Sequence, residues 1–223
     1  MKINTSFSIF AERYLVEFHE ALALLSVPTL ERIYRLIEKV RTGGKKLIVV
    51  GNGGSAANAM HYVCDFSKGT AVKGHKRLRS MSLASETAIV TAYANDFSYE
   101  DIFSEQMETH VDRGDLVFVM SASGNSPNVV KAVRAAKRRG ATVAGIFGFG
   151  GGKLKSLVDV SIVIPHKNYG QAEDVQTVIM HIISQYMRLT LESSRSQKGK
   201  KGQPFDSAQG KRGQKGRRPK NYR

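Results

Sequence analysis

The sequence has 223 residues, of which 41% are hydrophobic, and a net charge of +15, which suits one globular domain with a single sizeable core. No apolar run reaches the roughly 18 residues of a membrane-spanning helix, and the N-terminus lacks the apolar stretch and small-residue cleavage site of a signal peptide. The single cysteine, Cys64, cannot form an intrachain disulfide. We therefore expect a cytoplasmic protein with no membrane partner.

The positive charge is concentrated at the C-terminus. Residues 193–223 contain eleven Lys or Arg and one acid, Asp206, and so carry +10 of the total of +15. Their composition of Gly, Gln, Lys, Arg and Ser predicts a disordered basic tail after a domain of residues 1–192. Such an arm can bind nucleic acid, but nothing else in the sequence supports that partner. A solvated extension with no selected role is the alternative.

Helices and short apolar strands alternate along the body of the chain. Residues 1–42 predict an N-terminal helical segment, because Phe7, Phe10 and Tyr14 recur at three- and four-residue spacing and Pro28 divides the segment. Strands are predicted at 46–50, 78–83, 115–120, 141–147 and 160–164. Helices are expected at 56–66, 86–93, 103–111, 127–139 and 172–192. This alternation predicts an α/β domain whose parallel sheet is flanked by helices on both faces.

Two turns that follow predicted strands have unusual chemistry. The first, residues 51–55, reads GNGGS and joins the strand 46–50 to a helix. Glycines let backbone amides approach a ligand closely, and a helix start offers unpaired N–H groups to an anion. Ligands bind outside the carboxyl ends of the strands in such sheets. The turn is a candidate phosphate site, and a tight strand-to-helix connection is the alternative.

The second turn, residues 121–127, reads SASGNSP and follows the strand 115–120. We expect Ser126 to cap the next helix and Pro127 to lie in its first turn. Three serines in six residues exceed what capping requires, and their hydroxyls can hold a phosphate without a lysine. Together the two turns predict a protein that binds a phosphorylated ligand.

Five segments carry a resemblance to a known family. They read GNGGSAANAMH at 51–61, YANDF at 93–97, DIFSEQ at 101–106, GDLVFVMSASGNSPNVVKA at 114–132 and EDVQTVIMHI at 173–182. Through them the chain resembles the sugar isomerase (SIS) domain family over residues 7–192, and within it the phosphoheptose isomerases. The SASGNS turn is typical of the SIS domain, and the placement of His61 and His181 is typical of the isomerases.

The resemblance implies an SIS-type fold and an enzyme, an intramolecular oxidoreductase of the isomerase class. Its expected reaction converts sedoheptulose 7-phosphate to D-glycero-D-manno-heptose 7-phosphate, a step toward the heptose of bacterial lipopolysaccharide and other surface polysaccharides. It also implies a homotetramer with active sites between subunits. The positions that match substrate contacts are Asn52, Gly53, Gly54, Ser55, Asn95, Asp96, Ser121, Ala122, Ser123, Ser126 and Glu173.

The resemblance implies that Asp65 is the base and His181 the acid of the reaction. His61 and Asp65 are four residues apart on one predicted helix, and Glu173 and His181 lie two turns apart on the last helix. If those helices meet, the four side chains form a ligand set suited to zinc or another divalent metal. Two positions depart from the family: Asp65 stands where the isomerases carry glutamate, and Glu173 stands where they carry glutamine.

Two other interpretations stay open. An SIS-fold protein can bind a phosphosugar without catalysis or act as an adaptor for a replication initiator, and the basic tail favours this interpretation. His61 and His181 argue against it, because an adaptor has no use for two histidines in a ligand pocket. An isomerase of another phosphosugar is the further alternative, which the substitution at Asp65 favours.

Overall fold

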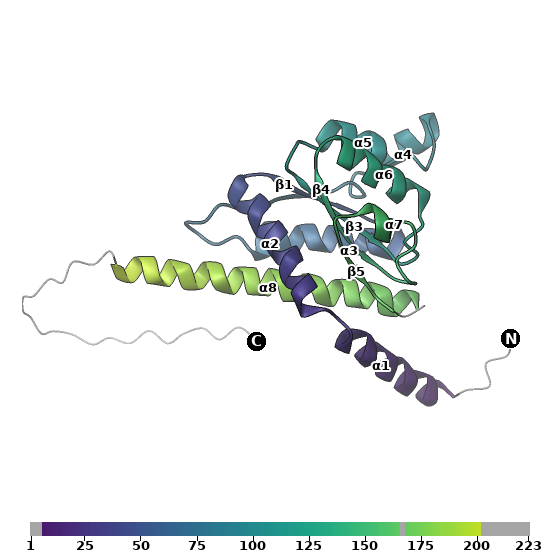
Figure 1. Ribbon diagram of the computed structural model, residues 1–223, viewed down its shortest axis with the longest axis horizontal. Helices are drawn as coiled ribbons and strands as arrows, with labels where there is room; N and C mark the ends of the chain where they lie inside the picture. Colours follow the sequence, from purple (N-terminus) through teal and green to yellow (C-terminus); the bar gives the residue numbers. More distant parts are fainter. Residues whose placement is uncertain (1–5, 166–167, 202–223) are drawn as a thin grey trace, which may run out of the picture.

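The computed structural model describes residues 6–165 and 168–201. Its centre is a five-stranded parallel sheet in the order β2-β1-β3-β4-β5 (Figure 1). The strands are β1 Lys46–Val50, β2 Arg79–Ser82, β3 Leu116–Ser121, β4 Thr142–Phe147 and β5 Val160–Val163. The strands predicted from apolar runs are therefore confirmed, each to within one residue at either end.

Helices cover both faces of the sheet (Figure 1). The helices on one face are α1 Phe7–Ala23, α2 Val27–Gly43, α3 Gly53–Cys64 and α8 Tyr169–Lys201. Those on the other are α4 Thr87–Asp96, α5 Ser104–His110, α6 Pro127–Arg138 and the short α7 Leu154–Leu157, which the sequence pattern did not predict. On β3, Phe118 packs toward the first group while Val117 and Val119 pack toward the second, because successive side chains of a strand point to opposite faces. The predicted fold class is confirmed.

The N-terminal segment divides into two helices near Pro28, as predicted. The hydroxyl of Ser26 accepts the backbone N–H of Thr29 at 3.3 Å and caps α2, and Pro28 lies in its first turn. The preceding helix, α1, contacts α8 through Tyr14, whose hydroxyl donates to Asp174 Oδ2 at 3.0 Å. The two helices thus extend the layer that α8 forms beneath the sheet in Figure 1.

The last helix, α8, is longer than the sequence pattern predicts. It runs from Tyr169 to Lys201 instead of over residues 172–192. Residues 193–201 therefore continue the helix, since Ser, Gln, Lys and Arg can extend a helix that has already formed. The remainder of the expected tail, residues 202–223, lies outside the described residues. Within the described part of the chain, no helix is long and apolar enough to cross a membrane.

Candidate active site

The turn between β1 and α3 brings backbone amides to the carboxyl end of the sheet. Helix α3 begins at Gly53, earlier than the predicted start at Ala56, and Asn52 precedes it. Gly53 has a φ of +52°, in the left-handed region that favours glycine. Ser55 is buried, and its hydroxyl donates to Gln176 Oε1 on α8 at 3.3 Å. The GNGGS segment therefore forms the first turn of α3, whose N–H groups are free to bind an anion.

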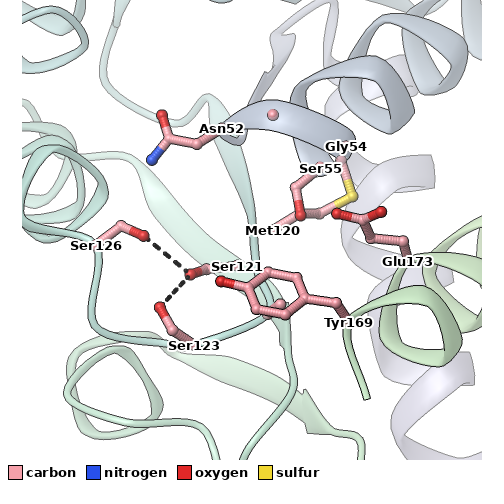
Figure 2. Close-up of a pocket in the computed structure, with 11 residues that line it drawn as sticks. Asn52, Gly54, Ser55, Met120, Ser121, Ser123, Ser126, Tyr169 and Glu173 are labelled. Atoms are coloured by element: carbon pink, nitrogen blue, oxygen red, sulfur yellow. Dashed lines mark hydrogen bonds between the residues drawn. The ribbon is translucent and has the colours of Figure 1, made fainter. Parts of the chain in front are cut away.

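The hydroxyls of the turn between β3 and α6 gather around Ser121. Its Oγ lies 3.5 Å from Ser123 Oγ and 3.4 Å from Ser126 Oγ (Figure 2). It also accepts the backbone N–H of Gly124 at 3.1 Å. Ser126 occupies the cap position of α6, as predicted, but its side chain makes no capping hydrogen bond. Pro127 has no N–H, and the N–H of Val129 donates to Asn128 Oδ1 at 2.9 Å. Among residues 127–129, the backbone N–H of Asn128 is therefore left available to a ligand.

A neighbouring glycine-rich loop supports this turn from behind. Gly124 has a φ of +65°, and a Cβ there would overlap with the carbonyl group of Gly151. The Gly124 carbonyl accepts the backbone N–H of Leu154 at 3.0 Å, and Asn125 Oδ1 accepts that of Lys153 at 3.0 Å. The turn thus packs backbone to backbone against the β4–α7 loop, which requires glycine at this position.

The two turns enclose a cavity of about 190 Å³, which we call the serine pocket (Figure 2). Its lining residues are Asn52, Gly53, Gly54, Ser55, Met120, Ser121, Ala122, Ser123, Ser126, Tyr169 and Glu173. All predicted substrate contacts line it except Asn95 and Asp96. Among these described lining residues none is a lysine or an arginine. A phosphate in the pocket would therefore meet neutral hydroxyls and helix N-termini, with the Glu173 carboxylate at the wall.

Two residues of the serine pocket were missed by the sequence analysis. Met120 precedes Ser121 on β3, and Tyr169 is the first residue of α8. The Tyr169 ring contacts Phe149 edge to face, with ring centroids 5.3 Å apart. Met120 lies at the carboxyl end of a strand, where ligands bind in such sheets, so its position could have marked it as a pocket residue. Tyr169 lies between the predicted strand 160–164 and the predicted helix 172–192, where no pattern marked it.

Glu173 places a carboxylate beside the start of α3. A Cβ at Gly54 would overlap with this carboxylate, which therefore lies directly against the Gly54 backbone. Burial raises the pKa of Glu173, and the nearby charge of Asp174 raises it further. The N-terminus of α3 favours a negative charge at this place. Glu173 therefore occupies a position at the pocket wall that also suits an anionic ligand.

His61, Asp65 and His181 meet where α3 ends and α8 passes it, and we call them the His–Asp cluster. Their ligand atoms all lie within 4.8 Å of one another. Nε2 of His61 lies 3.8 Å from Asp65 Oδ1, and Nε2 of His181 lies 3.6 Å from Asp65 Oδ2. All three side chains are accessible to solvent. The fold thus brings together three of the four expected metal ligands, and Glu173 lies outside this group.

Asp65 opens a short π-helix, η1 Asp65–Gly69, directly after α3. The backbone N–H of Thr70 donates to the Asp65 carbonyl at 3.0 Å, and its hydroxyl donates to the Phe66 carbonyl at 2.6 Å. Such turns are rare and are found mostly inside α-helices at functional sites. Apolar periodicity did not predict this one. It coincides with the position at which aspartate replaces the glutamate of the resembling family.

Helix α8 connects the serine pocket with the His–Asp cluster. Glu173 and His181 are eight residues apart on this helix, which corresponds to about 12 Å at 1.5 Å per residue. A sugar chain of several carbons can span this separation. The phosphate and the reacting carbons of one ligand can therefore be recognised at opposite ends of the site.

Asn95 and Asp96 lie at the end of α4, away from the serine pocket. The Asn95 side-chain amide donates to Asp96 Oδ1 at 2.8 Å. Asp96 lines a separate cavity of about 420 Å³ together with Tyr93 and Phe97. No residue of α4, all of which lie in the described part of the chain, is buried. Within one chain, the structure does not bring these two residues to the other expected contacts.

Comparisons with known proteins agree with this geometry. Residues 14–148 match the SIS domain. The phosphoheptose isomerase of Fusobacterium nucleatum is 39% identical over 153 residues, which cover 69% of this chain and 78% of that protein. The phosphoheptose isomerase of Trichlorobacter lovleyi is 36% identical over 170 residues, covering 76% and 86%. The structure of phosphoheptose isomerase from Neisseria gonorrhoeae has a TM-score of 0.73 at 28% identity, covering 81% of this chain and 95% of that one.

A parallel sheet with two anion-binding turns at its carboxyl edge defines an α/β protein that binds a phosphorylated ligand. The chain belongs to the SIS domain family and, within it, to the phosphoheptose isomerases. The resemblance drawn from the sequence motifs is thereby confirmed.

Proposed function

We propose that this protein converts sedoheptulose 7-phosphate to D-glycero-D-manno-heptose 7-phosphate. The observation that carries the proposal is the placement of the serine pocket and the His–Asp cluster at the two ends of one site along α8. The relatives named phosphoheptose isomerase, at 36–39% identity, support the same reaction. The product would enter heptose synthesis for bacterial lipopolysaccharide and other surface polysaccharides.

In this proposal the serine pocket holds the phosphate. The hydroxyls of Ser121, Ser123 and Ser126 donate to the phosphate oxygens, together with the free backbone amides at the start of α3 and the backbone N–H of Asn128 in α6. Hydrogen bonds to an ionised acceptor are stronger than those between neutral groups. Fixing the phosphate orients the rest of the sugar along α8, so that its carbonyl end lies at the His–Asp cluster.

Asp65 acts as the base and His181 as the acid. Asp65 removes a proton from C1 of the ketose while His181 protonates the carbonyl oxygen at C2, which gives an enediol. Return of a proton to C2 and loss of the proton on O1 give the aldose. The distance of 3.6 Å between His181 Nε2 and Asp65 Oδ2 supports this pairing, because both groups can reach one carbon–oxygen unit.

The His–Asp cluster suits a divalent metal, for which we propose zinc. Two imidazoles and one carboxylate with ligand atoms within 4.8 Å match catalytic zinc sites, in which three protein ligands leave one position open. His61, Asp65 and His181 would hold the ion. When bound, it would polarise the carbonyl oxygen of the sugar in place of a proton from His181, because a histidine nitrogen that holds the ion carries no proton. Glu173, the fourth expected ligand, is better placed in a single chain to contact the substrate at the serine pocket.

We further propose a homotetramer with active sites between subunits. Three observations support it: α1 and α8 expose large apolar side chains such as Phe7 and Leu189, α4 buries no residue, and Asn95 and Asp96 lie outside the serine pocket of their own chain. In an assembly, α4 of one chain can bring these two residues to the site of another. Light scattering on the purified protein tests the subunit number.

Two parts of the proposal concern the setting of the enzyme. A cytoplasmic location is supported by the single cysteine, Cys64. An SIS domain of residues 1–192 followed by a basic tail is supported by the composition of residues 193–223, and helix α8 extends across this boundary to Lys201. A nucleic-acid partner for the tail has no further support.

The experiment is to incubate the purified full-length protein with sedoheptulose 7-phosphate, with and without a chelator, and to follow new aldose by NMR. We expect conversion that the chelator slows and added Zn²⁺ restores. The Asp65→Asn protein, prepared in the same way, is the matched control. Tight binding of the sugar without conversion would contradict the proposal and favour a non-catalytic phosphosugar-binding protein.

A further inference from the structure

The side chains of Asn52 and Asn128 form a reciprocal pair of hydrogen bonds. Asn52 Nδ2 donates to Asn128 Oδ1, and Asn128 Nδ2 donates to Asn52 Oδ1, both at 2.9 Å. Asn52 directly precedes α3, and Asn128 lies in the first turn of α6. The pair therefore joins the starts of the two helices whose turns line the serine pocket.

The orientation of both amides is fixed by their other partners. The backbone N–H of Val129 donates to Asn128 Oδ1 at 2.9 Å, which identifies that atom as the oxygen. Oδ1 of Asn52 must then accept from Asn128, and it also accepts the hydroxyl of Tyr99 at 3.2 Å. Two hydrogen bonds use both lone pairs of this oxygen. The side-chain oxygen of Asn52 is therefore fully used by protein partners and does not accept from a ligand.

Asn128 does not itself belong to the wall of the serine pocket. The residue is 1% exposed, and it is absent from the described residues that line the cavity. The Asn52 side chain makes no capping hydrogen bond to α3. The pair is thus not needed to start that helix. Its effect is to hold the start of α3 against the start of α6.

A third segment is attached at the same point. Tyr99 follows α4, the helix that carries Asn95 and Asp96. The same loop is held to α6 by Lys131, whose Nζ lies 2.9 Å from Asp101 Oδ1 and 3.2 Å from Glu100 Oε2. The amide pair therefore sits where both phosphate-binding turns and the loop after α4 converge.

We propose that Asn128 is a positioning residue that, by holding Asn52, fixes the spacing of the two phosphate-binding turns. The inference rests on the proposed function, because it assigns a role in binding the phosphate of that substrate. A phosphate must accept from both turns at once. A spacing fixed before binding avoids the cost of ordering the turns when the ligand arrives. Loss of the pair should therefore weaken phosphate binding without altering the proton-transfer groups Asp65 and His181, which lie in the His–Asp cluster and not at the serine pocket.

The test is Asn128→Leu, a substitution of similar size that removes both hydrogen bonds. Binding of inorganic phosphate and of sedoheptulose 7-phosphate is measured by titration calorimetry, and kcat and KM are measured separately. We expect both dissociation constants and KM to rise about tenfold, as the loss of one or two buried hydrogen bonds implies. We expect kcat to stay within about twofold, because a spacing defect acts on binding and not on the chemical step.

A double-mutant cycle separates positioning from general damage. If Asn128 acts through Asn52, then Asn52→Leu and the double variant should bind phosphate about as weakly as Asn128→Leu alone. The control is Gln106→Leu, which removes a buried amide that donates to the carbonyls of Leu83 at 3.1 Å and Ile102 at 2.6 Å. It should lower the melting temperature and leave phosphate affinity unchanged.

The outcomes distinguish this inference from the proposed function. Suppose that the wild type binds phosphate but does not isomerise the sugar, and that Asn128→Leu binds phosphate weakly. That result would contradict the proposed reaction and support the positioning role. Wild-type phosphate affinity in Asn128→Leu would overturn the inference whatever the activity. Additive losses for Asn52→Leu and Asn128→Leu, or an equal loss of affinity in Gln106→Leu, would overturn it as well.

Discussion

The carboxylate of Glu173 lies against the backbone of Gly54, where the first turn of α3 meets α8. This contact limits which residues can occupy position 54, because any side chain there would meet the Glu173 carboxylate. It also places a negative charge at the wall of a pocket whose described lining contains no lysine or arginine. Both consequences can be measured.

Gly54→Ala should change ligand binding more than stability. The atoms that a Cβ would meet are the far end of the flexible Glu173 side chain, which can swing away at little cost. The displaced carboxylate would then enter the serine pocket and compete with the phosphate. We expect KM for the sugar phosphate to rise about tenfold, with a melting temperature close to wild type. Gly54→Ala combined with Glu173→Ala should recover part of the affinity, and no recovery would contradict this explanation.

Glu173→Gln should bind phosphate more tightly than the wild type. The substitution keeps the shape of the side chain and removes a charge that repels an anion in the same pocket. At an effective dielectric constant near 20, a unit charge several ångströms away is worth about 1–3 kcal/mol, and partial solvent exposure reduces this to a gain of about three- to tenfold. Calorimetric titration with inorganic phosphate measures it. Asp174→Asn is the control, because Asp174 lies next in the chain and outside the lining of the pocket. It should change the affinity less.

Asp65→Asn and His181→Ala should each reduce turnover by about 10²–10⁴-fold, the usual contribution of a general acid or base. Phosphate binding should persist in both, because the serine pocket lies at the other end of α8. His19→Ala on the exposed face of α1 is a histidine control that should behave as wild type. Asp65→Glu restores the residue of the resembling isomerases and should retain turnover. Wild-type rates in Asp65→Asn or His181→Ala would remove the assignment.

Zinc binding should depend on the His–Asp cluster. His61→Ala removes one imidazole of the three groups that lie together, and two remaining ligands hold Zn²⁺ far more weakly than three. Competition with a fluorescent chelator measures the affinity without reference to activity. His110→Ala, a substitution in α5 outside the cluster, should bind Zn²⁺ as the wild type does. Equal affinity in the His61→Ala and wild-type proteins would exclude His61 as a ligand.

The loop that carries Tyr99 should lose stability at acid pH. Hydrogen bonds from Ser98 at 2.6 Å and from Lys131 at 2.9 Å hold the pKa of Asp101 below its ordinary value. A lowered folded-state pKa stabilises the protein above the unfolded-state value, near pH 4, and this stabilisation is lost as the pH falls through the folded-state value.

Asp101→Asn tests this pH dependence. It should be less stable than wild type at pH 7, and the difference should shrink below about pH 4. Urea unfolding at several pH values provides the comparison. A stability difference that stays constant from pH 7 down to pH 3 would show that Asp101 contributes through packing and not through its charge.

The sheet and both turns could be predicted from the sequence because their signals are local. A run such as Leu116 to Ser121 is buried on both faces, so it is apolar throughout and ends at a turn. Glycine and serine at the end of such a strand mark a place where the backbone must meet a ligand or another chain segment. These signals point to the two turns that line the serine pocket.

Other features depend on contacts between distant segments and leave no local signal. The π-helix at Asp65 interrupts a sequence that reads as ordinary helix. The hydroxyl of Ser126 points toward Ser121 and not toward the helix that it precedes. Its orientation is set by Ser121, which competes with the helix N–H groups for this hydroxyl. Glu173 was expected among the metal ligands, and its contact with Gly54 could be found only once α3 and α8 were placed together.

The continuity of α8 has a consequence for selectivity among sugars. Glu173 and His181 lie on one continuous helix. The distance between the proposed phosphate site and the proposed proton-transfer groups is therefore set by the helical rise and not by a loop that can adapt. A five-carbon phosphosugar anchored by its phosphate would hold its carbonyl short of Asp65 and His181. In the proposed mechanism the enzyme would therefore select substrates by chain length, and inserting one residue between Glu173 and His181 would turn His181 by about 100° and abolish this selection.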